Sequence, residues 1–169
     1  SEMKKDAVIA VIISSICMLI YIWIRFKDIT FGAGAVIALL HDVLVVLMVY
    51  AVAKISVGNT FIACMLTIVG YSINATIVIY DRIRENRGSV KTKEALANVV
   101  NKSITETFSR SINTSLTTLI MVLMLAILGV DSVREFAIPL IAGIIAGGYS
   151  SVCISGTMWY LLKGRTLKK

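Results

Sequence analysis

Long blocks of apolar residues, almost free of charge, are the feature that most constrains this chain of 169 residues. The blocks cover residues 7–24, 29–53, 55–80, 111–130 and 136–162. Each is close to or above the roughly 18 to 20 residues that a helix needs to cross a hydrocarbon core about 30 Å thick. Because helices satisfy their own backbone hydrogen bonds in lipid and open sheets do not, the sequence predicts five transmembrane helices.

The predicted fold class is an all-α membrane protein, a bundle of five transmembrane helices plus one amphipathic cytoplasmic helix. The spans are expected at about 6–26, 29–53, 56–82, 111–130 and 135–162. Apolar residues repeat with helical period between about 89 and 109, which predicts the amphipathic helix. This helix either lies at the membrane surface against the bundle or offers a docking face to a partner protein.

Positive charge is distributed unevenly between the two sides of the predicted bundle. Of the 17 Lys and Arg residues, only Lys4, Lys5, Lys54 and Arg134 lie on the side that holds the N-terminus. Since cytoplasmic loops carry an excess of Lys and Arg, we expect the N-terminus of this chain outside and its C-terminus in the cytoplasm. The net charge of +7 therefore reflects membrane topology, and no nucleic-acid binding is expected. The short segment before the first span predicts that the natural protein has an upstream helix and a periplasmic domain that this chain lacks.

Asp42 lies in the middle of the second predicted span, which contains no other Asp, Glu, Lys or Arg residue. A carboxyl group at that depth costs on the order of 2.5 to 3.5 kcal/mol, so it is a functional-site hypothesis. Ala35 and Ala38 share its helical face, which predicts a closely packed neighbouring helix. His41 is the only histidine and points about 100° away on an ideal helix. Its imidazole is either part of a proton relay or a packed or water-bonded side chain.

The third predicted span carries a polar stripe that runs toward its cytoplasmic end. The stripe consists of Thr67, Gly70, Asn74 and Asp81, and Arg82 follows it. Asn74 and Asp42 differ in depth by one or two helical turns, so their side chains can meet if the two helices pack together. Asn74 is either a member of a proton relay or a hydrogen-bonding residue between helices.

Small residues predict where helices approach one another closely. Gly143 and Gly147 are spaced by four residues in the last span, and Gly70 is assigned to the same role in the third. The motifs of common enzymes are missing from the sequence, including the phosphate-binding loop, the H-E-x-x-H zinc motif and the nucleophile elbow. No metal site is expected. A buried carboxylate that alternately takes and releases a proton is the one available means of coupling transport to an energy source.

Three segments of the sequence are distinctive: A-L-L-H-D-V at 38–43, T-I-V-G-Y-S-I-N at 67–74 and Y-D-R-I-R-E-N at 80–86. They closely resemble segments of the SecD/SecF family, in particular its SecF members, in the resistance-nodulation-division superfamily of proton-driven transporters. The resemblance covers the chain from its first span to Leu162 and implies helices two to six of a six-helix protein. It also implies that SecD and SecF pair their membrane halves. Proton passage at their interface would then move periplasmic domains that pull a preprotein from the SecYEG channel.

The resemblance assigns a proton relay residue by residue. Asp42 matches the intramembrane aspartate tied to proton flow, and Asn74, Asp81 and Arg82 match the motif of the fourth helix of the family. Protons are the coupling ion, and no other cofactor is implied. One departure is Ala75, because many relatives have an aspartate there. A second carboxylate of the relay is therefore absent from this chain.

The predicted function is that of a Sec-pathway accessory subunit and not of an enzyme. With SecD, it would use the proton gradient to promote preprotein translocation across the bacterial inner membrane. Two alternatives stay open from the sequence. The first is a passive membrane scaffold without proton coupling, and the second is a proton-driven exporter of small molecules or lipids from the same superfamily.

Overall fold

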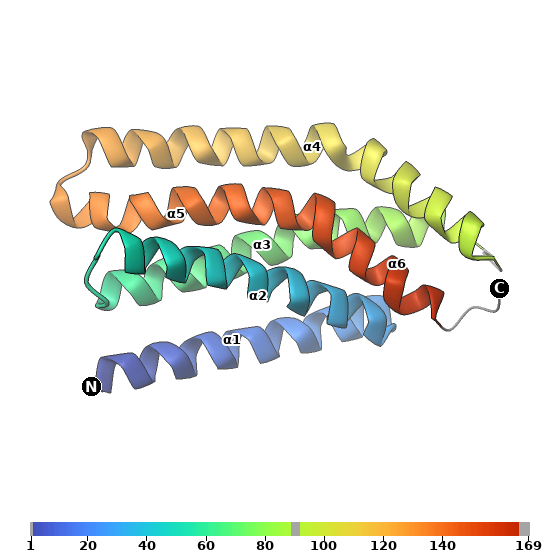
Figure 1. The fold of residues 1–169 in the computed structure, drawn as a ribbon, viewed down its shortest axis with the longest axis horizontal. Coiled ribbons are helices and arrows are strands. Elements are labelled where there is room, and N and C mark those ends of the chain that lie inside the picture. Colours follow the sequence, from blue (N-terminus) through green and yellow to red (C-terminus); the bar gives the residue numbers. More distant parts are fainter. Residues whose placement is uncertain (1, 89–91, 166–169) are drawn as a thin grey trace.

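Five long helical segments run side by side in the computed structural model, which describes residues 2–88 and 92–165 (Figure 1). They are α1 (Glu2–Phe26), α2 (Ile29–Val52), α3 (Asn59–Asn86), α4 (Lys93–Leu128), and a last segment made of α5 (Asp131–Tyr149), the π-helical η1 (Ser150–Ser155) and α6 (Gly156–Gly164). Successive segments alternate in direction. The α1–α2 turn, the ends of α3 and α6 and the start of α4 therefore share one end of the bundle, on the right in Figure 1, which we call the C-terminal end.

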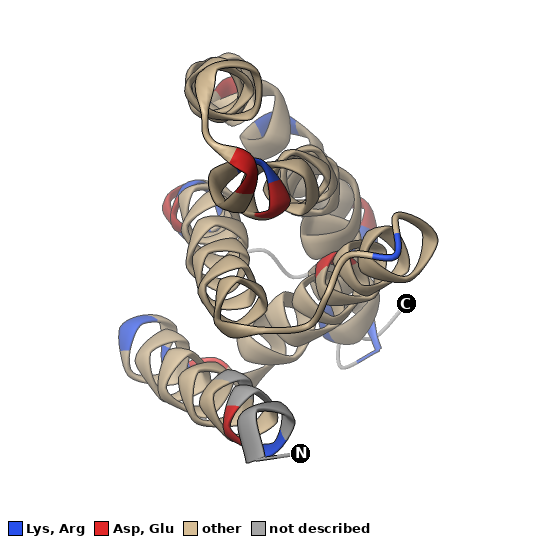
Figure 2. Ribbon diagram, turned by 90° about the vertical axis from the view of Figure 1, so that its left-hand side faces the viewer, with Lys and Arg blue, Asp and Glu red and all other residues tan. Residues whose placement is uncertain are grey.

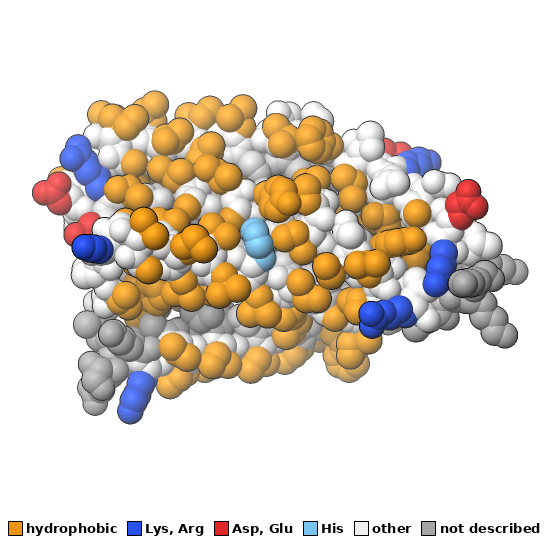
Figure 3. Space-filling model, in the orientation of Figure 1, with side chains coloured by type: hydrophobic (Ala, Val, Ile, Leu, Met, Phe, Trp, Pro, Cys, Tyr) orange, Lys and Arg blue, Asp and Glu red, His pale blue; other side chains and the backbone are white. Residues whose placement is uncertain are grey.

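The outer surface of the bundle is apolar between two charged ends. Lys, Arg, Asp and Glu gather at the helix ends, and hydrophobic side chains cover the face between them (Figures 2 and 3). Ile24, Met48 and Ile127 are each more than half exposed. In the described part of the chain, five helical segments are long and apolar enough to cross a membrane. The predicted all-α fold class is confirmed, and the chain is a multi-pass membrane protein.

The fourth segment differs from its prediction. The sequence predicted an amphipathic helix at 89–109 and a separate span at 111–130, whereas the structure has one helix over Lys93–Leu128. Residues 89–91 lie outside the described part of the chain. The helix begins after Thr92, whose side chain accepts a hydrogen bond from a backbone N–H three residues later at 3.3 Å.

The sequence keeps α4 continuous because neither glycine nor proline occurs within it. The helix accommodates its hydroxyl side chains, since Ser103 and Thr107 bond back to carbonyl groups of the preceding turn at 2.7 and 2.8 Å. The apolar side of the first half, with Leu96 and Val100, is buried in the core. The amphipathic stretch therefore packs against the bundle as the first part of the fourth span.

Two apolar clusters form the core, and a polar layer lies between them. Leu39 and Ile73 belong to the cluster nearer the C-terminal end, and Val46 and Ile68 belong to the other. Asp42 lies between Leu39 and Val46 along α2 and is fully buried. The core is therefore apolar toward each end of the bundle and polar at its middle.

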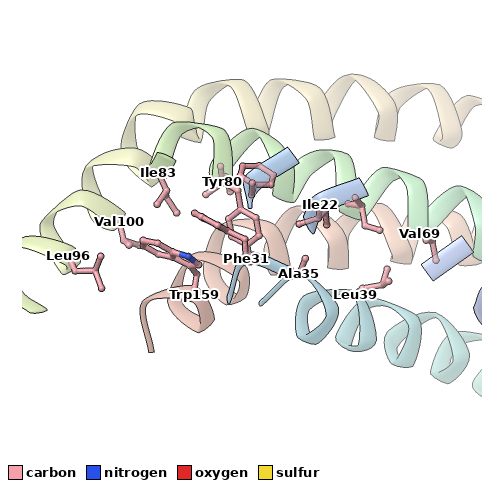
Figure 4. Packing of buried hydrophobic residues seen from close by; sticks show 13 residues of the cluster. Ile22, Phe31, Ala35, Leu39, Val69, Tyr80, Ile83, Leu96, Val100 and Trp159 are labelled. Carbon is pink, nitrogen blue, oxygen red and sulfur yellow. The ribbon is translucent and has the colours of Figure 1, made fainter. Parts of the chain in front are cut away.

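Aromatic rings fill the first cluster where α2, α3 and α6 meet (Figure 4). The Phe31 ring lies 4.8 Å from the ring centres of both Tyr80 and Trp159. The Tyr80 hydroxyl donates a hydrogen bond to the Ser155 carbonyl at 3.2 Å, which ties α3 to the last segment. Gly34 permits this approach, because a methyl group there would lie 2.5 Å from the Tyr80 hydroxyl.

Asp28, in the turn between α1 and α2, joins three parts of the chain at the C-terminal end. Its carboxylate accepts hydrogen bonds from Arg87 at 3.1 Å, from Lys163 at 2.8 Å and from the Thr30 hydroxyl at 2.7 Å. Burial by itself would raise the pKa of this carboxyl, but the hydrogen bonds from Lys163 and Thr30 outweigh burial and lower the pKa from 3.8 to about 2. The ends of α3 and α6 are thereby fastened to the α1–α2 turn.

The three glycines assigned to helix packing have different surroundings. A methyl group on Gly143 would overlap the Ile68 side chain and lie 3.1 Å from Val46. One on Gly147 would lie 3.2 Å from the Tyr71 ring. Both glycines therefore lie at close helix approaches. At Gly70, in contrast, a methyl group would meet no described atom within 4 Å, so the predicted packing role has no contact to support it.

We expect Gly143→Val to destabilise the bundle and Gly70→Val to leave it nearly unchanged. Overpacking a filled core position costs about 1 to 3 kcal/mol, and only Gly143 faces filled space. The measurement is the midpoint of thermal unfolding in detergent, followed by circular dichroism. Equal shifts for the two variants would contradict the packing described for α5.

Replacing Asp28 with asparagine should destabilise the protein in a pH-dependent manner. Because the folded-state pKa is below the unfolded value, the Asp28 contribution is complete above pH 3.8 and is lost as the pH falls toward about 2. The unfolding midpoint of Asp28→Asn should therefore lie below that of the wild type at neutral pH, and the two midpoints should converge at the acidic end.

The control is Asp131→Asn, because the Asp131 side chain is fully exposed and lies 3.9 Å from Arg134. An exposed pair of this kind contributes little, so the control should show a much smaller difference at every pH. A gap between wild type and Asp28→Asn that persists unchanged at pH values near 2 would refute the ion-pair assignment.

Candidate functional site

Asp42 is fully buried where α2, α3 and η1 meet. Its Oδ2 atom accepts hydrogen bonds from the hydroxyls of Ser72 at 2.5 Å and Ser150 at 2.7 Å. Its Oδ1 atom lies 3.0 Å from Nδ1 of His41. The carboxylate thus faces protein on every side, with two neutral donors and one ionisable neighbour.

The last segment brings its serines to Asp42 through close packing of small residues. A methyl group on Gly147 would lie 3.6 Å from Oδ2 of Asp42, so this face of α5 approaches the carboxylate directly. Ser150 follows Gly147 by three residues and shares its face. Ser150, Ser151 and Ser155 are all buried in the π-helical turn that follows. Such turns occur mostly as single insertions in α-helices, frequently at functional sites.

His41 connects the buried carboxylate to the surface of the bundle. Helical geometry predicted that the side chains of adjacent residues would not face each other, yet the His41 ring turns back to Asp42. The contact satisfies Oδ1, which the two serines leave without a partner. The His41 side chain is 36% exposed, and the histidine is visible among hydrophobic side chains midway along the face in Figure 3. It therefore provides a polar link from Asp42 to the outside of the bundle.

The structure does not bring Asn74 to Asp42. Asn74 follows Ser72 by two positions, which is about 200° around the helix. Its side chain is exposed and makes no hydrogen bond within the described residues. The sequence indicated that Asn74 and Asp42 lie at similar depths in the membrane. It did not indicate that the Asn74 side chain points to a different side of α3 from the one that faces Asp42.

Asp81 and Arg82 belong to the ion pairs of the C-terminal end. Asp81 lies nine residues beyond Ser72, or about 13 Å along the helix axis, and pairs with Arg25 at 3.0 Å. Arg82 is bonded to Glu106 of α4 at 2.6 Å. Both residues therefore fasten α3 to its neighbours, and the structure shows no contact of either with Asp42.

Ser72 and Ser150 are the partners of Asp42 that the sequence argument missed. A signal for Ser72 exists, because it continues the buried face of α3 that includes Met65, Val69 and Thr76 at helical spacing. In the described part of the chain, no group of three His, Cys, Asp or Glu residues lies close enough to hold a metal ion. The site is a single buried carboxyl group in contact with two hydroxyls and one imidazole.

Comparison with known proteins decides the family. The family described as "Protein export membrane protein SecD/SecF, C-terminal" matches residues 1–165. The chain belongs to the SecD/SecF family.

Relatives in this family are similar over nearly the whole chain. The chain is 46% identical to the protein translocase subunit SecF of Alicyclobacillus acidocaldarius over 170 residues, which is 99% of the chain and 55% of that protein. It is 43% identical to the protein translocase subunit SecDF of Bacillus subtilis, covering 99% of the chain and 23% of that protein. The chain thus spans about half the length of its SecF relatives.

A solved structure has the same fold. The crystal structure of SecDF in a super-membrane-facing form superimposes with a TM-score of 0.87 at 40% identity, over 98% of this chain and 22% of that one. The five-helix bundle therefore has the same fold as part of that SecDF chain.

Proposed function

We propose that the chain is the membrane part of a Sec-pathway accessory subunit that pairs with SecD and uses the proton gradient to promote preprotein translocation through SecYEG. The observation that carries this proposal is the complete burial of the Asp42 carboxyl among three helices. Membership in a family of protein translocase subunits supports the substrate class. The B. subtilis relative named SecDF supports pairing with SecD.

A proton on Asp42 would change the contacts between three helices. The ionised carboxyl only accepts hydrogen bonds, as the Ser72 and Ser150 geometry requires. A protonated Oδ2 must donate one bond, so one serine hydroxyl has to turn and become the acceptor. Moving one charge through 100 mV releases about 2.3 kcal/mol, which is comparable to the 1.5 to 3 kcal/mol of a hydrogen bond to a charged group. One proton therefore supplies enough free energy to break and re-form such a bond.

The last segment is the element that would respond. It bends between α5 and α6 at the π-helical turn, and Ser150 opens that turn (Figure 1). Loss of the Ser150 bond to Asp42 would free the start of the turn, while the Tyr80 bond to the Ser155 carbonyl still holds its end. Proton binding would thus alter the bend of the last segment relative to α2.

The chain would reside in the bacterial inner membrane with its N-terminus outside and its C-terminus in the cytoplasm. The charged C-terminal end, with its excess of Lys and Arg, would then face the cytoplasm. The apolar flanks of the bundle would contact lipid and the membrane half of SecD.

We expect Asp42→Asn in the full-length protein to abolish the part of preprotein export that depends on the proton gradient. Asparagine keeps the size and accepts hydrogen bonds from the serines, but it does not titrate. Export into membrane vesicles that contain the SecD partner, with and without an uncoupler, measures the effect. Asp131→Asn is the control, because it removes an exposed carboxylate at the end of the bundle away from the C-terminal end. This variant should behave as the wild type. Gradient-dependent export that survives in Asp42→Asn would support the passive scaffold instead.

Two neighbouring buried serines provide a matched pair. Ser150 donates to Asp42, whereas Ser151 donates to the Gly148 carbonyl at 3.0 Å. We expect Ser150→Ala to reduce gradient-dependent export by about three- to tenfold, because one hydrogen bond to the carboxyl is lost. Ser151→Ala should change it less than about twofold, since its bond is local. Equal effects of the two variants, measured in the same vesicles, would argue against coupling through Ser150.

A further inference from the structure

A groove opens between α1 and α2 at the end of the bundle where α1 begins, which we call the N-terminal end. Its volume is about 540 Å³, within the range of ligand-binding pockets. The lining includes Val8 of α1, Leu47 and Ala51 of α2 and Phe61 of α3. The groove is therefore an apolar space that three helices of a membrane-spanning bundle enclose.

The groove exists because α1 packs closely only near its last residues. Among the α1 side chains that the structure describes, only Ile22 and Phe26 are fully buried, and both lie in the last two turns. The helix lies at the margin of the bundle (Figures 1 and 2). Its first half, which includes Val8, leaves space beside α2 that no described side chain fills. This space lies on the lipid-facing flank of the protein.

The seam between α1 and α2 is also incompletely filled further toward the middle of the bundle. A second pocket there, of about 90 Å³, is lined by Leu19 of α1 and Leu40 of α2, among others. Leu40 lies ten residues before Tyr50, which lines the groove, so the two are about 15 Å apart along the helix axis. This length equals half of a hydrocarbon core about 30 Å thick. An acyl chain that enters beside Tyr50 would therefore end near the second pocket.

Lys54 places a positive charge at the mouth of the groove. It lines the groove in the turn that follows α2, and none of the described lining residues is Asp or Glu. Its φ of 51° is the left-handed conformation that glycine usually supplies after a helix, so a long basic side chain stands where a smaller residue would be less strained. Tyr50 precedes it by one helical turn. Tyrosine and lysine in this arrangement are typical of the layer between lipid headgroups and hydrocarbon.

We propose that the groove binds one phospholipid with an anionic headgroup, from the leaflet at the N-terminal end of the bundle. The phosphate lies against Lys54, and one acyl chain lies between α1 and α2. A lysine near the membrane surface attracts anionic lipid, and the apolar lining matches the acyl chain. The inference requires only that the bundle spans a membrane, and it does not depend on proton coupling or on pairing with SecD.

The size of the groove favours a lipid over a further protein helix. A helix about 10 Å wide fills roughly 420 Å³ in each turn of 5.4 Å, so the groove holds little more than one turn. A transmembrane helix would therefore lie across the mouth of the groove and leave its interior empty. A flexible acyl chain can follow the narrow seam between the two helices.

Replacing Lys54 with glutamine should weaken the binding of anionic lipid about fivefold, which is the effect of one lysine at a membrane surface. Delipidated full-length protein is titrated with phosphatidylglycerol or with phosphatidylcholine of the same acyl chains, and bound lipid is counted by native mass spectrometry. The affinity for phosphatidylcholine should change less than about twofold. Arg134→Gln is the control, because it removes an exposed positive charge at the same end of the bundle but outside the groove. Equal affinities of wild type and Lys54→Gln for phosphatidylglycerol would overturn the proposal.

Two alanines provide a matched pair that tests the path of the acyl chain. Ala51 lines the groove, whereas Ala53, two positions later, is exposed and lies outside its lining. We expect Ala51→Phe to fill the groove and to remove one bound phospholipid of either headgroup. Ala53→Phe adds the same ring elsewhere and should keep the wild-type number of bound lipids. The same lipid count in both variants would contradict binding inside the groove.

Photocrosslinking locates the acyl chain directly. Full-length protein is placed in nanodiscs that contain phosphatidylglycerol with a diazirine near the end of one acyl chain, and the labelled residues are mapped by mass spectrometry. We expect labels on Leu19 and Leu40, where the chain should end, and their loss in Ala51→Phe. Labels confined to the outer surfaces of α1 and α2, or an upstream helix crosslinked to these leucines in place of lipid, would refute the assignment.

Discussion

The Asp42 carboxylate is the contact on which the packing of three helical segments depends. It occupies the polar layer between two apolar clusters, and it receives one hydroxyl from α3 and another from η1. If the carboxylate were absent, Ser72 would be left buried without an acceptor, at about 1 to 3 kcal/mol, and Ser150 would keep only its 3.3 Å bond to the Gly147 carbonyl. Asp42 therefore orients the surfaces that α3 and η1 present to α2.

Contacts at the C-terminal end of the bundle limit where a change at Asp42 can move the helices. At the C-terminal end, Asp28 joins the ends of α3 and α6 to the α1–α2 turn, and Arg82 joins α3 to α4. The aromatic contacts of Phe31 lie just inside these ion pairs. A change at Asp42 would therefore be absorbed in the middle of the last segment, where the π-helical turn interrupts the α-helix and permits a kink.

The sequence predicted five long apolar helices because apolar length is a local property that the bilayer dictates. The sequence predicted two helices in place of α4, because the polarity of the chain changes near Arg110. The absence of glycine and proline from this stretch favours the single continuous helix that the structure shows. The partners of Asp42 were harder to predict. Ser72 could have been found from the buried face of α3, but the inward turn of the His41 ring depends on an unsatisfied carboxylate oxygen that only the assembled bundle reveals.

Two faces of α3 carry different chemistry at the same depth. Ser72 points to the carboxylate of Asp42, whereas Asn74 and Ala75 line a polar pocket between α3 and α4 together with Arg110. Tyr71 stands between them, since its ring and Oδ2 of Asp42 both approach Gly147 and its hydroxyl bonds to Ser115 of α4. Any rotation of α3 that weakens the Ser72 bond must also move Asn74 relative to Arg110, so the contacts on the two faces of α3 would change together through one rigid helix.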